Sequence, residues 1–224
     1  MSFTLDKVVP WGRSYDEYGA MFSLTKADLN KKILGCGDGP ASFNAELTKI
    51  GGKVVSVDPI YLFFAKDIMS RIDATYDEVM EQTAKNYNEF VWKHIKSIDD
   101  LGSIRMKAME RFLEDYPKAD GRYISGELPF LPFKNKEFDL ALCSHFLFLY
   151  SKQHSFEFHI QSIKELCRVA SEVRIFPLLE LGARKSGHLD KVISMLEKEE
   201  CEWSIIKVCY EFQKGGNEML HIKS

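Results

Sequence analysis

The 224-residue sequence lacks the features that mark two large classes of protein. No run of lysine or arginine exceeds a few residues and the formal net charge is only -3 at pH 7, so the broad basic surface of a nucleic-acid binder is absent. The most apolar run, LALCSHFLFLY from Leu140, is too short to span a bilayer and contains a histidine. We therefore expect neither a nucleic-acid partner nor a membrane partner.

Cysteine is scarce, and the amino terminus has no secretion signal. The five cysteines are odd in number, widely spaced and mostly within apolar segments, as free thiols are in a reducing compartment. The start, MSFTLDKVVPWGRSYDEY, has neither a basic region nor a continuous apolar stretch. These absences predict a cytoplasmic protein without a disulfide framework.

Sequence motifs for several kinds of chemistry are also missing. No Gly-x-Ser-x-Gly is present, which argues against a hydrolase. Cys143 and His145 are two residues apart, and His154 and His159 are five apart, so neither pair has the spacing of a zinc site and we expect no metal. No glycine loop ends in Gly-Lys-Ser/Thr, which removes the main support for nucleoside-triphosphate binding.

The sequence does contain an alternation of short β-rich runs with longer helical patterns. An apolar fraction of 45% is enough to bury a sizeable core. Such alternation is typical of an α/β fold, a mostly parallel sheet with helices on both faces. The glycine-rich QKGGN should join the last two strands as an antiparallel hairpin at a sheet edge. We expect seven strands, at residues 31–37, 53–58, 122–126, 138–145, 171–179, 203–212 and 218–224.

Helices are predicted between these strands. PASFNAELTKIGG has a proline, Pro40, at a plausible first helical position, and residues 153–169 and HLDKVISMLEKEE have apolar residues at helical spacing. The connection at 61–121 is far longer than one crossover needs. We expect a single domain over 1–224 with a cap of two or three helices inserted at 61–121. The inserted helices either form the pocket for a substrate, or they only extend the core or make a dimer contact.

Three glycines, Gly35, Gly37 and Gly39, follow the first apolar run in KKILGCGDGP. Without a Cβ, a glycine backbone can bend sharply and approach a ligand closely. The dinucleotide fingerprint needs a further glycine where this sequence has Pro40. Asp58 ends the second strand, where a carboxylate can accept hydrogen bonds from both ribose hydroxyls. Together they indicate an adenosine-type ligand, which suits a nucleotide-dependent dehydrogenase as well as a methyltransferase.

A third contact for such a ligand is indicated by GELPFLPF, followed by KNKEFD. Here, and over roughly Lys31 to Leu179, the sequence resembles the Rossmann-like (class I) S-adenosylmethionine-dependent methyltransferases, whose usual pattern is Gly-Asp-Ala-Glu-x-Leu-Pro-Phe and then Phe-Asp. The resemblance implies a Rossmann-like seven-stranded sheet, S-adenosylmethionine as cofactor and methyl transfer. It also implies that Glu127 accepts from the adenine amino group, that the amide of Leu128 meets the neighbouring ring nitrogen, and that Asp58 holds the ribose.

One departure from the family pattern leaves other functions open. Ile33 stands where the family usually has an acidic residue near the methionine end of the cofactor, and Asp38 would take over that contact with the ammonium group. An NAD(P)-dependent oxidoreductase shares the glycine loop and Asp58 but does not explain GELPFLPF. A non-catalytic S-adenosylmethionine-binding protein is the second alternative, which Ile33 keeps open.

The acceptor is expected to be a small molecule, because SHF follows the fourth strand where nucleic-acid amino methyltransferases carry Asn-Pro-Pro-aromatic. Methyl transfer needs positioning more than acid–base chemistry. His145 is the best-placed base, or else a partly buried histidine satisfied by its neighbours. In the amino-terminal segment 1–30, Arg13 is predicted to pair with the cofactor carboxylate, and Tyr15 and Tyr18 either meet the acceptor or pack on the core.

The predicted site therefore has three parts, and the protein is expected to be a monomer or a homodimer. The predicted cofactor contacts are Arg13, Gly35, Cys36, Gly37, Asp38, Gly39, Asp58, Pro59, Glu127, Leu128 and Ser144. The predicted acceptor contacts are Tyr15, Tyr18 and His145, and His145 is the predicted catalytic base.

Overall fold

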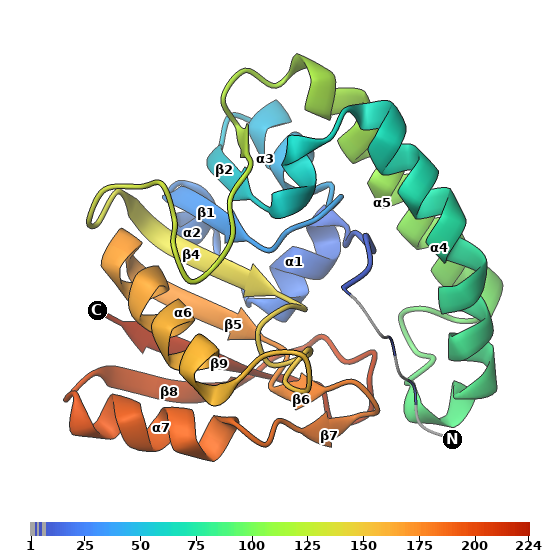
Figure 1. The fold of residues 1–224 in the computed structure, drawn as a ribbon. Helices are drawn as coiled ribbons and strands as arrows, with labels where there is room; N and C mark the ends of the chain where they lie inside the picture. The colour runs from blue at the N-terminus through green and yellow to red at the C-terminus, as the bar shows by residue number, and fades with distance from the viewer. Residues whose placement is uncertain (1–2, 4, 6–7) are drawn as a thin grey trace.

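A seven-stranded sheet forms the centre of the computed structural model, which describes residues 3, 5 and 8–224 (Figure 1). The strand order is β3-β2-β1-β4-β5-β9-β8. Strands β3, β2, β1, β4 and β5 pair in parallel, whereas β9 is antiparallel to both β5 and β8. The predicted seven strands, their mostly parallel arrangement and the antiparallel hairpin at the edge are confirmed. The strands are β1 (Lys32–Cys36), β2 (Lys53–Val57), β3 (Tyr123–Ile124), β4 (Phe138–Ser144), β5 (Ala170–Phe176), β8 (Glu202–Lys207) and β9 (Glu218–Lys223).

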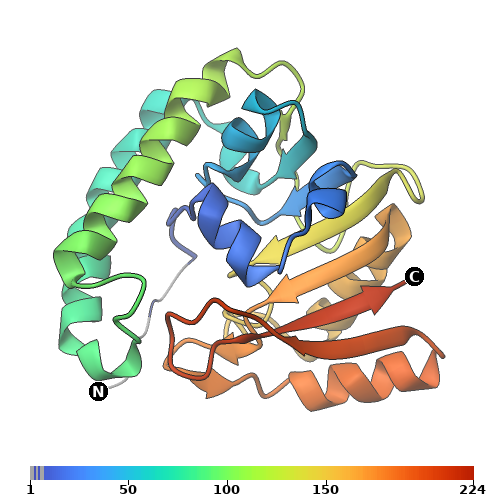
Figure 2. The same ribbon diagram turned by 180° about the vertical axis from the view of Figure 1, so that it is seen from behind.

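Helices cover both faces of the sheet, as Figures 1 and 2 show from opposite sides. On one face α6 and α7 bury Ile163 and Val192 against β4 and β5, and on the other α1 and α3 bury Tyr18 and Phe43 against β1 and β4. Burial on both faces explains why the central strands are continuous apolar runs. The helices are α1 (Tyr15–Met21), α2 (Lys26–Leu29), α3 (Phe43–Lys49), α6 (Phe156–Val169) and α7 (Leu189–Lys198).

Several predicted boundaries were wrong, each for a local reason. Strand β5 ends at Phe176 because Pro177 follows and has no backbone N–H to continue the ladder. Helix α3 begins at Phe43, after Ser42, so Pro40 is not its first residue. A small two-stranded sheet of β6 (Leu179–Glu180) and β7 (Arg184–Lys185) was not predicted.

The segment 61–121 contains two long helices, α4 (Ala65–Lys85) and α5 (Ile98–Asp115), with the short turns η1 (Pro59–Leu62), η2 (Tyr87–Glu89) and η3 (Tyr116–Lys118) at their ends. The two helices run side by side beyond the carboxyl ends of the parallel strands (Figures 1 and 2). The predicted helical insertion is thus present, and its membership of a single domain stays a prediction. No helix in the described part of the chain is long and apolar enough to cross a membrane.

Candidate functional site

A cavity of about 380 Å³ lies at the carboxyl ends of the parallel strands. It is lined by the loops after β1, β2, β3 and β4, by the amino-terminal segment and by residues of α4 and α5. The strand order reverses between β1 and β4, and open α/β sheets bind ligands in the crevice at such a reversal. The cavity therefore lies where the topology of the sheet favours a ligand.

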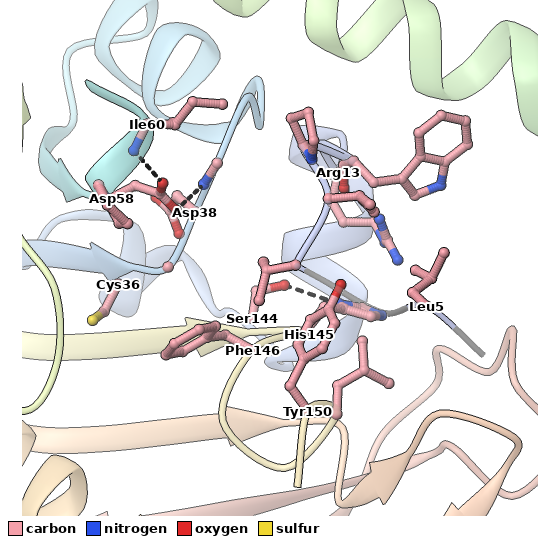
Figure 3. Close-up of a pocket in the computed structure, with 18 of the residues that line it drawn as sticks. Leu5, Arg13, Cys36, Asp38, Asp58, Ile60, Ser144, His145, Phe146 and Tyr150 are labelled. Carbon is pink, nitrogen blue, oxygen red and sulfur yellow. Dashed lines mark hydrogen bonds between the residues drawn. The ribbon is translucent and has the colours of Figure 1, made fainter. Parts of the chain in front are cut away.

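The cavity brings together most of the residues that the sequence predicts for the site. Gly35 and Tyr15 do not line it. Those that do are Arg13, Tyr18, Cys36, Gly37, Asp38, Gly39, Asp58, Pro59, Glu127, Leu128, Ser144 and His145. Figure 3 shows Asp38 and Asp58 on one side of it, and Arg13, His145 and Tyr150 on the other. Their roles toward a ligand stay predictions.

The two residues outside the cavity have structural tasks. A Cβ on Gly35 would lie 1.8 Å from Oδ2 of Asp38, so this glycine makes room for a carboxylate of its own loop. The ring of Tyr15 stacks on Phe43 with centroids 5.7 Å apart and is one of the contacts that hold α1 on α3. Contact between Tyr15 and an acceptor in the cavity is thus not available, which corrects the expectation for that residue.

Asp38 is held firmly at the base of the glycine loop. Its Oδ1 accepts a hydrogen bond from the Tyr18 hydroxyl at 2.7 Å, and its Oδ2 accepts one from the Ser56 hydroxyl at 2.6 Å. Burial raises the pKa of Asp38 to about 6 despite these bonds. Gly37 and Gly39 on either side have φ of 68° and 52°, in the left-handed region that favours glycine. Tyr18 is itself buried and packs in the core cluster with Phe43.

Asp58 joins the glycine loop to the turn after β2. Its Oδ2 accepts from the Gly39 amide at 2.8 Å and its Oδ1 accepts from the Ile60 amide at 2.9 Å. Each carboxylate oxygen can accept a further bond, so the residue can still receive a pair of ligand hydroxyls. Burial, opposed by these two bonds and supported by nearby Glu127, raises the pKa of Asp58 to about 6. Glu127 is exposed at the rim of the cavity and Leu128 is buried beside it.

His145 follows β4 in a left-handed conformation, with φ of 49°. Its amide donates to the Phe176 carbonyl at 2.7 Å, and its Nδ1 lies 3.0 Å from the Ser144 hydroxyl oxygen. Burial, and then the positive charges of Arg13 and Arg105, hold the pKa of His145 well below its usual value. The imidazole is therefore neutral at pH 7.

Arg13 is a half-buried residue whose guanidinium has no carboxylate partner among residues 3, 5 and 8–224. Its Nη1 donates to the Trp11 carbonyl at 2.6 Å, and its buried Nε has no hydrogen-bond partner. Burial, followed by repulsion from Arg105, lowers the pKa of Arg13 to about 10, which leaves it charged at pH 7. A buried charge without a partner is costly, so this position is suited to an anionic ligand group.

Sequence reasoning missed the cluster that surrounds Arg13. Arg105 of α5 is fully buried and its Nη1 lies 2.5 Å from Oε2 of Glu17, while the Tyr210 hydroxyl donates to Oε1 of Glu17 at 2.8 Å. Two guanidinium groups thus lie near one carboxylate, which is bonded to Arg105 and not to Arg13, and the cluster has an excess positive charge. Residues 17, 105 and 210 are far apart in the chain, so no local motif could have indicated them.

The insertion forms part of the cavity wall. Val79 and Thr83 of α4 and Leu101 of α5 line the cavity, while Ile68 and Ile72, at the other end of α4, pack in a core cluster with α5. The insertion therefore both lines the cavity and extends the core, and its contact with an acceptor stays a prediction. Helical periodicity placed these side chains on one face but could not indicate what the face covers.

Comparison with known proteins gives a clear relative and more distant structural similarities. No protein-family model matches this chain. The chain is 37% identical over 221 residues to the uncharacterized protein MJ0045 of Methanocaldococcus jannaschii, over 98% of this chain and 97% of that protein.

Two solved structures are similar at low identity. One is magnesium protoporphyrin IX methyltransferase (ChlM) from Synechocystis PCC 6803 with bound SAM, at 13% identity and a TM-score of 0.46, covering 94% of this chain and 78% of that chain. The other is a SAM-dependent methyltransferase, possible histamine N-methyltransferase (TM1293), from Thermotoga maritima, at 12% identity and a TM-score of 0.43, covering 94% and 88%. The Rossmann-like fold of this chain follows from its own strand order and register.

Proposed function

The chain belongs to the same family as MJ0045, and we propose that it is an S-adenosylmethionine-dependent methyltransferase that acts on a small molecule. The observation that carries the proposal is the pair of Asp58 and Arg13 at opposite sides of one cavity (Figure 3). Asp58 offers two carboxylate oxygens for a ribose diol, and Arg13 offers a buried guanidinium that lacks an anion. S-adenosylmethionine has a ribose diol in its adenosine half and an amino-acid carboxylate at the end of its methionine half.

The residues that line the cavity are of the types that such a ligand needs. Glu127 and Leu128 would hold the adenine, Asp58 the ribose, and the backbone of Gly37 to Gly39 the part between ribose and methionine. The guanidinium of Arg13, which lines the cavity, would donate to the carboxylate. When bound, the cofactor supplies an electrophilic methyl group. The task of the chain is then to align the acceptor and to exclude water.

A dinucleotide cofactor fits less well. Its pyrophosphate would need the free amides at the start of α3. In this chain the Ser42 amide already donates to the Arg13 carbonyl at 3.0 Å, and Glu46 adds a negative charge in the first turn. A Cβ on Gly12 would lie only 2.1 Å from the Pro40 carbonyl oxygen, so the amino-terminal segment lies directly on the glycine loop. These contacts disfavour the oxidoreductase alternative.

A cytoplasmic location is part of the proposal. All five cysteines are free, as thiols are in a reducing compartment.

The test is calorimetric titration with S-adenosylhomocysteine. Asp58→Ala and Glu127→Ala are each expected to weaken binding about tenfold or more, because each removes a polar contact worth ~1.4 kcal/mol or more. Glu114→Ala, on the exposed face of α5, is the matched control and should bind as the wild type does. NADH, followed by fluorescence, should not bind. Absence of S-adenosylhomocysteine binding at high micromolar concentration would refute the proposal.

Methyl transfer itself separates the enzyme from a non-catalytic binding protein. Radiolabelled S-adenosylmethionine should transfer its methyl group to a small molecule in a metabolite extract. If the cofactor binds but no label is transferred to any extract or to the probe acceptors described below, the chain is a binding protein only.

A further inference from the structure

We infer that the methyl acceptor is a small aromatic molecule with a hydroxyl group, a phenol, and that an ammonium-bearing acceptor is excluded. This inference rests on the proposed function, since it concerns the part of the same cavity that the adenosine contacts leave free. Within that cavity, the carboxylates lie in one half and most of the apolar side chains lie in the other.

The carboxylates of the cavity all lie in one half of it. Asp38, Asp58 and Glu127 follow β1, β2 and β3, which form one half of the sheet. The other half lies over β4, β5 and the chain after β8, and no carboxylate from the described residues lines it. The charged side chain that faces this half is Arg13, backed by Arg105. A protonated amine would lose its hydration there without gaining a partner, and it would be repelled.

The wall of this second half is made mainly of aromatic rings and leucines. The rings of Phe90 and Phe212 stack with centroids 4.8 Å apart, and Phe3 meets Phe90 edge-on at 5.9 Å. Opposite these rings, Leu149 and Leu181 are buried near the ends of the strands. The Leu181 amide donates to the Leu149 carbonyl at 3.1 Å. Offset and edge contacts with such rings favour a flat aromatic ligand over a polar one.

A proton acceptor lies where the two halves meet. The Nδ1–H of His145 would donate to the Ser144 hydroxyl oxygen, so that Nε2 is unprotonated and can meet the acceptor. The neutral imidazole would take the proton of the acceptor hydroxyl as the oxygen forms its bond to the methyl carbon. The carbon–sulfur bond of the cofactor breaks, its electron pair stays on sulfur, and the sulfonium charge disappears. The positive charge left on His145 is lost when the proton passes to water.

The first experiment compares two probes of the same shape, 2-naphthol and 2-naphthylmethylamine, as acceptors with S-adenosylmethionine. The wild type is expected to methylate 2-naphthol and not the amine. His145→Asn keeps a residue type that tolerates the left-handed backbone at this position. It should lower the rate with 2-naphthol by on the order of 10²–10⁴-fold without changing S-adenosylhomocysteine affinity. Activity of the variant should recover toward pH 10, where a phenol ionises unaided.

The second experiment adds a carboxylate to the apolar half. Gln213 lines the cavity beside Phe212, and Gln213→Glu changes its charge with almost no change in shape. This variant should bind 2-naphthylmethylamine and should bind 2-naphthol about tenfold more weakly, whereas the matched variant Gln213→Met should keep the preference of the wild type. Calorimetry on protein saturated with S-adenosylhomocysteine measures both.

The outcomes separate the two proposals. Methylation of the amine by the wild type, or binding of neither probe to cofactor-saturated protein, overturns the inference about the acceptor and leaves the proposed function intact. Failure of S-adenosylhomocysteine to bind is instead a failure of the proposed function.

Discussion

Arg105 on the inserted helix α5 binds the carboxylate of Glu17 at 2.5 Å and so prevents Glu17 from neutralising Arg13. Both guanidinium groups lie within the electrostatic reach of Glu17, but its two oxygens are bonded to Arg105 and Tyr210. The insertion therefore acts on the amino-terminal segment as well as lining the cavity. It keeps one buried positive charge available to a ligand.

Replacement of Arg105 should transfer Glu17 to Arg13. In Arg105→Met we expect S-adenosylhomocysteine affinity to fall about tenfold, because the carboxylate of the ligand must then compete with Glu17 for Arg13. Affinity for 5′-methylthioadenosine, which has no carboxylate, should not change. The double variant with Glu17→Gln should regain affinity for S-adenosylhomocysteine. Calorimetry measures all three, and equal losses for both ligands would contradict this account. Stability should fall by less than the roughly 3–5 kcal/mol of a broken buried pair, because Arg13 replaces Arg105 as the partner of Glu17.

Removal of the Arg13 charge should separate binding from stability. Arg13→Met is expected to weaken S-adenosylhomocysteine binding by roughly 1.5–3 kcal/mol, the usual value of a hydrogen bond to a charged group. The ligand-free protein should become more stable, because an unpaired buried charge is removed. Thermal unfolding without ligand and calorimetry with it provide the two readouts, and exposed Arg184→Met is the control. A variant that is less stable and binds normally would show that Arg13 is structural.

The pH dependence of stability should reveal the raised pKa of Asp58. Its pKa in the folded protein is about 6, against 3.8 as its ordinary value, so between these pH values the folded state binds more protons than the unfolded state. The resulting stabilisation is complete below pH 3.8 and is lost as pH rises through 6. Asp58→Asn should therefore gain stability relative to the wild type from pH 4.5 to 7.5, by on the order of 2 kcal/mol. Urea unfolding across this range gives the difference, and a pH-independent difference would refute the shift.

Ligand binding should have the opposite pH dependence. Because only the ionised Asp58 can accept from both ribose hydroxyls, S-adenosylhomocysteine affinity should rise with pH up to about 6 and level off above it. Calorimetry from pH 5 to 8 measures this, and the rise should be absent in Asp58→Asn. An affinity that is constant across the range in the wild type would argue that Asp58 does not contact the ligand.

The close contact at Gly12 provides a test of the amino-terminal segment. In Gly12→Ala, the new Cβ would meet the Pro40 carbonyl oxygen and push the segment away from the glycine loop. We expect S-adenosylhomocysteine affinity to fall about tenfold as Arg13 moves with it. Gly19→Ala is the matched control, since nothing lies within 4 Å of its Cβ, and in helix α1 it should raise stability by about 0.5–1 kcal/mol. Unchanged affinity in Gly12→Ala would mean that the segment takes no part in binding.

Much of the fold could be predicted because its signals are local. Each of the seven sheet strands is a short apolar or β-rich run, and each crossover helix repeats its apolar residues at a helical interval. The glycine loop, Asp58 and GELPFLPF each follow a strand at the same edge of the sheet, so their convergence on one cavity followed once the strands were parallel.

Other features depended on contacts between distant residues, which no local pattern encodes. Tyr15 and Tyr18 are alike in sequence, yet one stacks outside the cavity on Phe43 and the other donates to Asp38. The sequence by itself determined the order of elements and the glycine loop, because hydrophobic period and glycine conformation act within a few residues. Only the tertiary structure decided that Arg13 stays unpaired and that the second half of the cavity is apolar, because packing brings residues 17, 105 and 210 together.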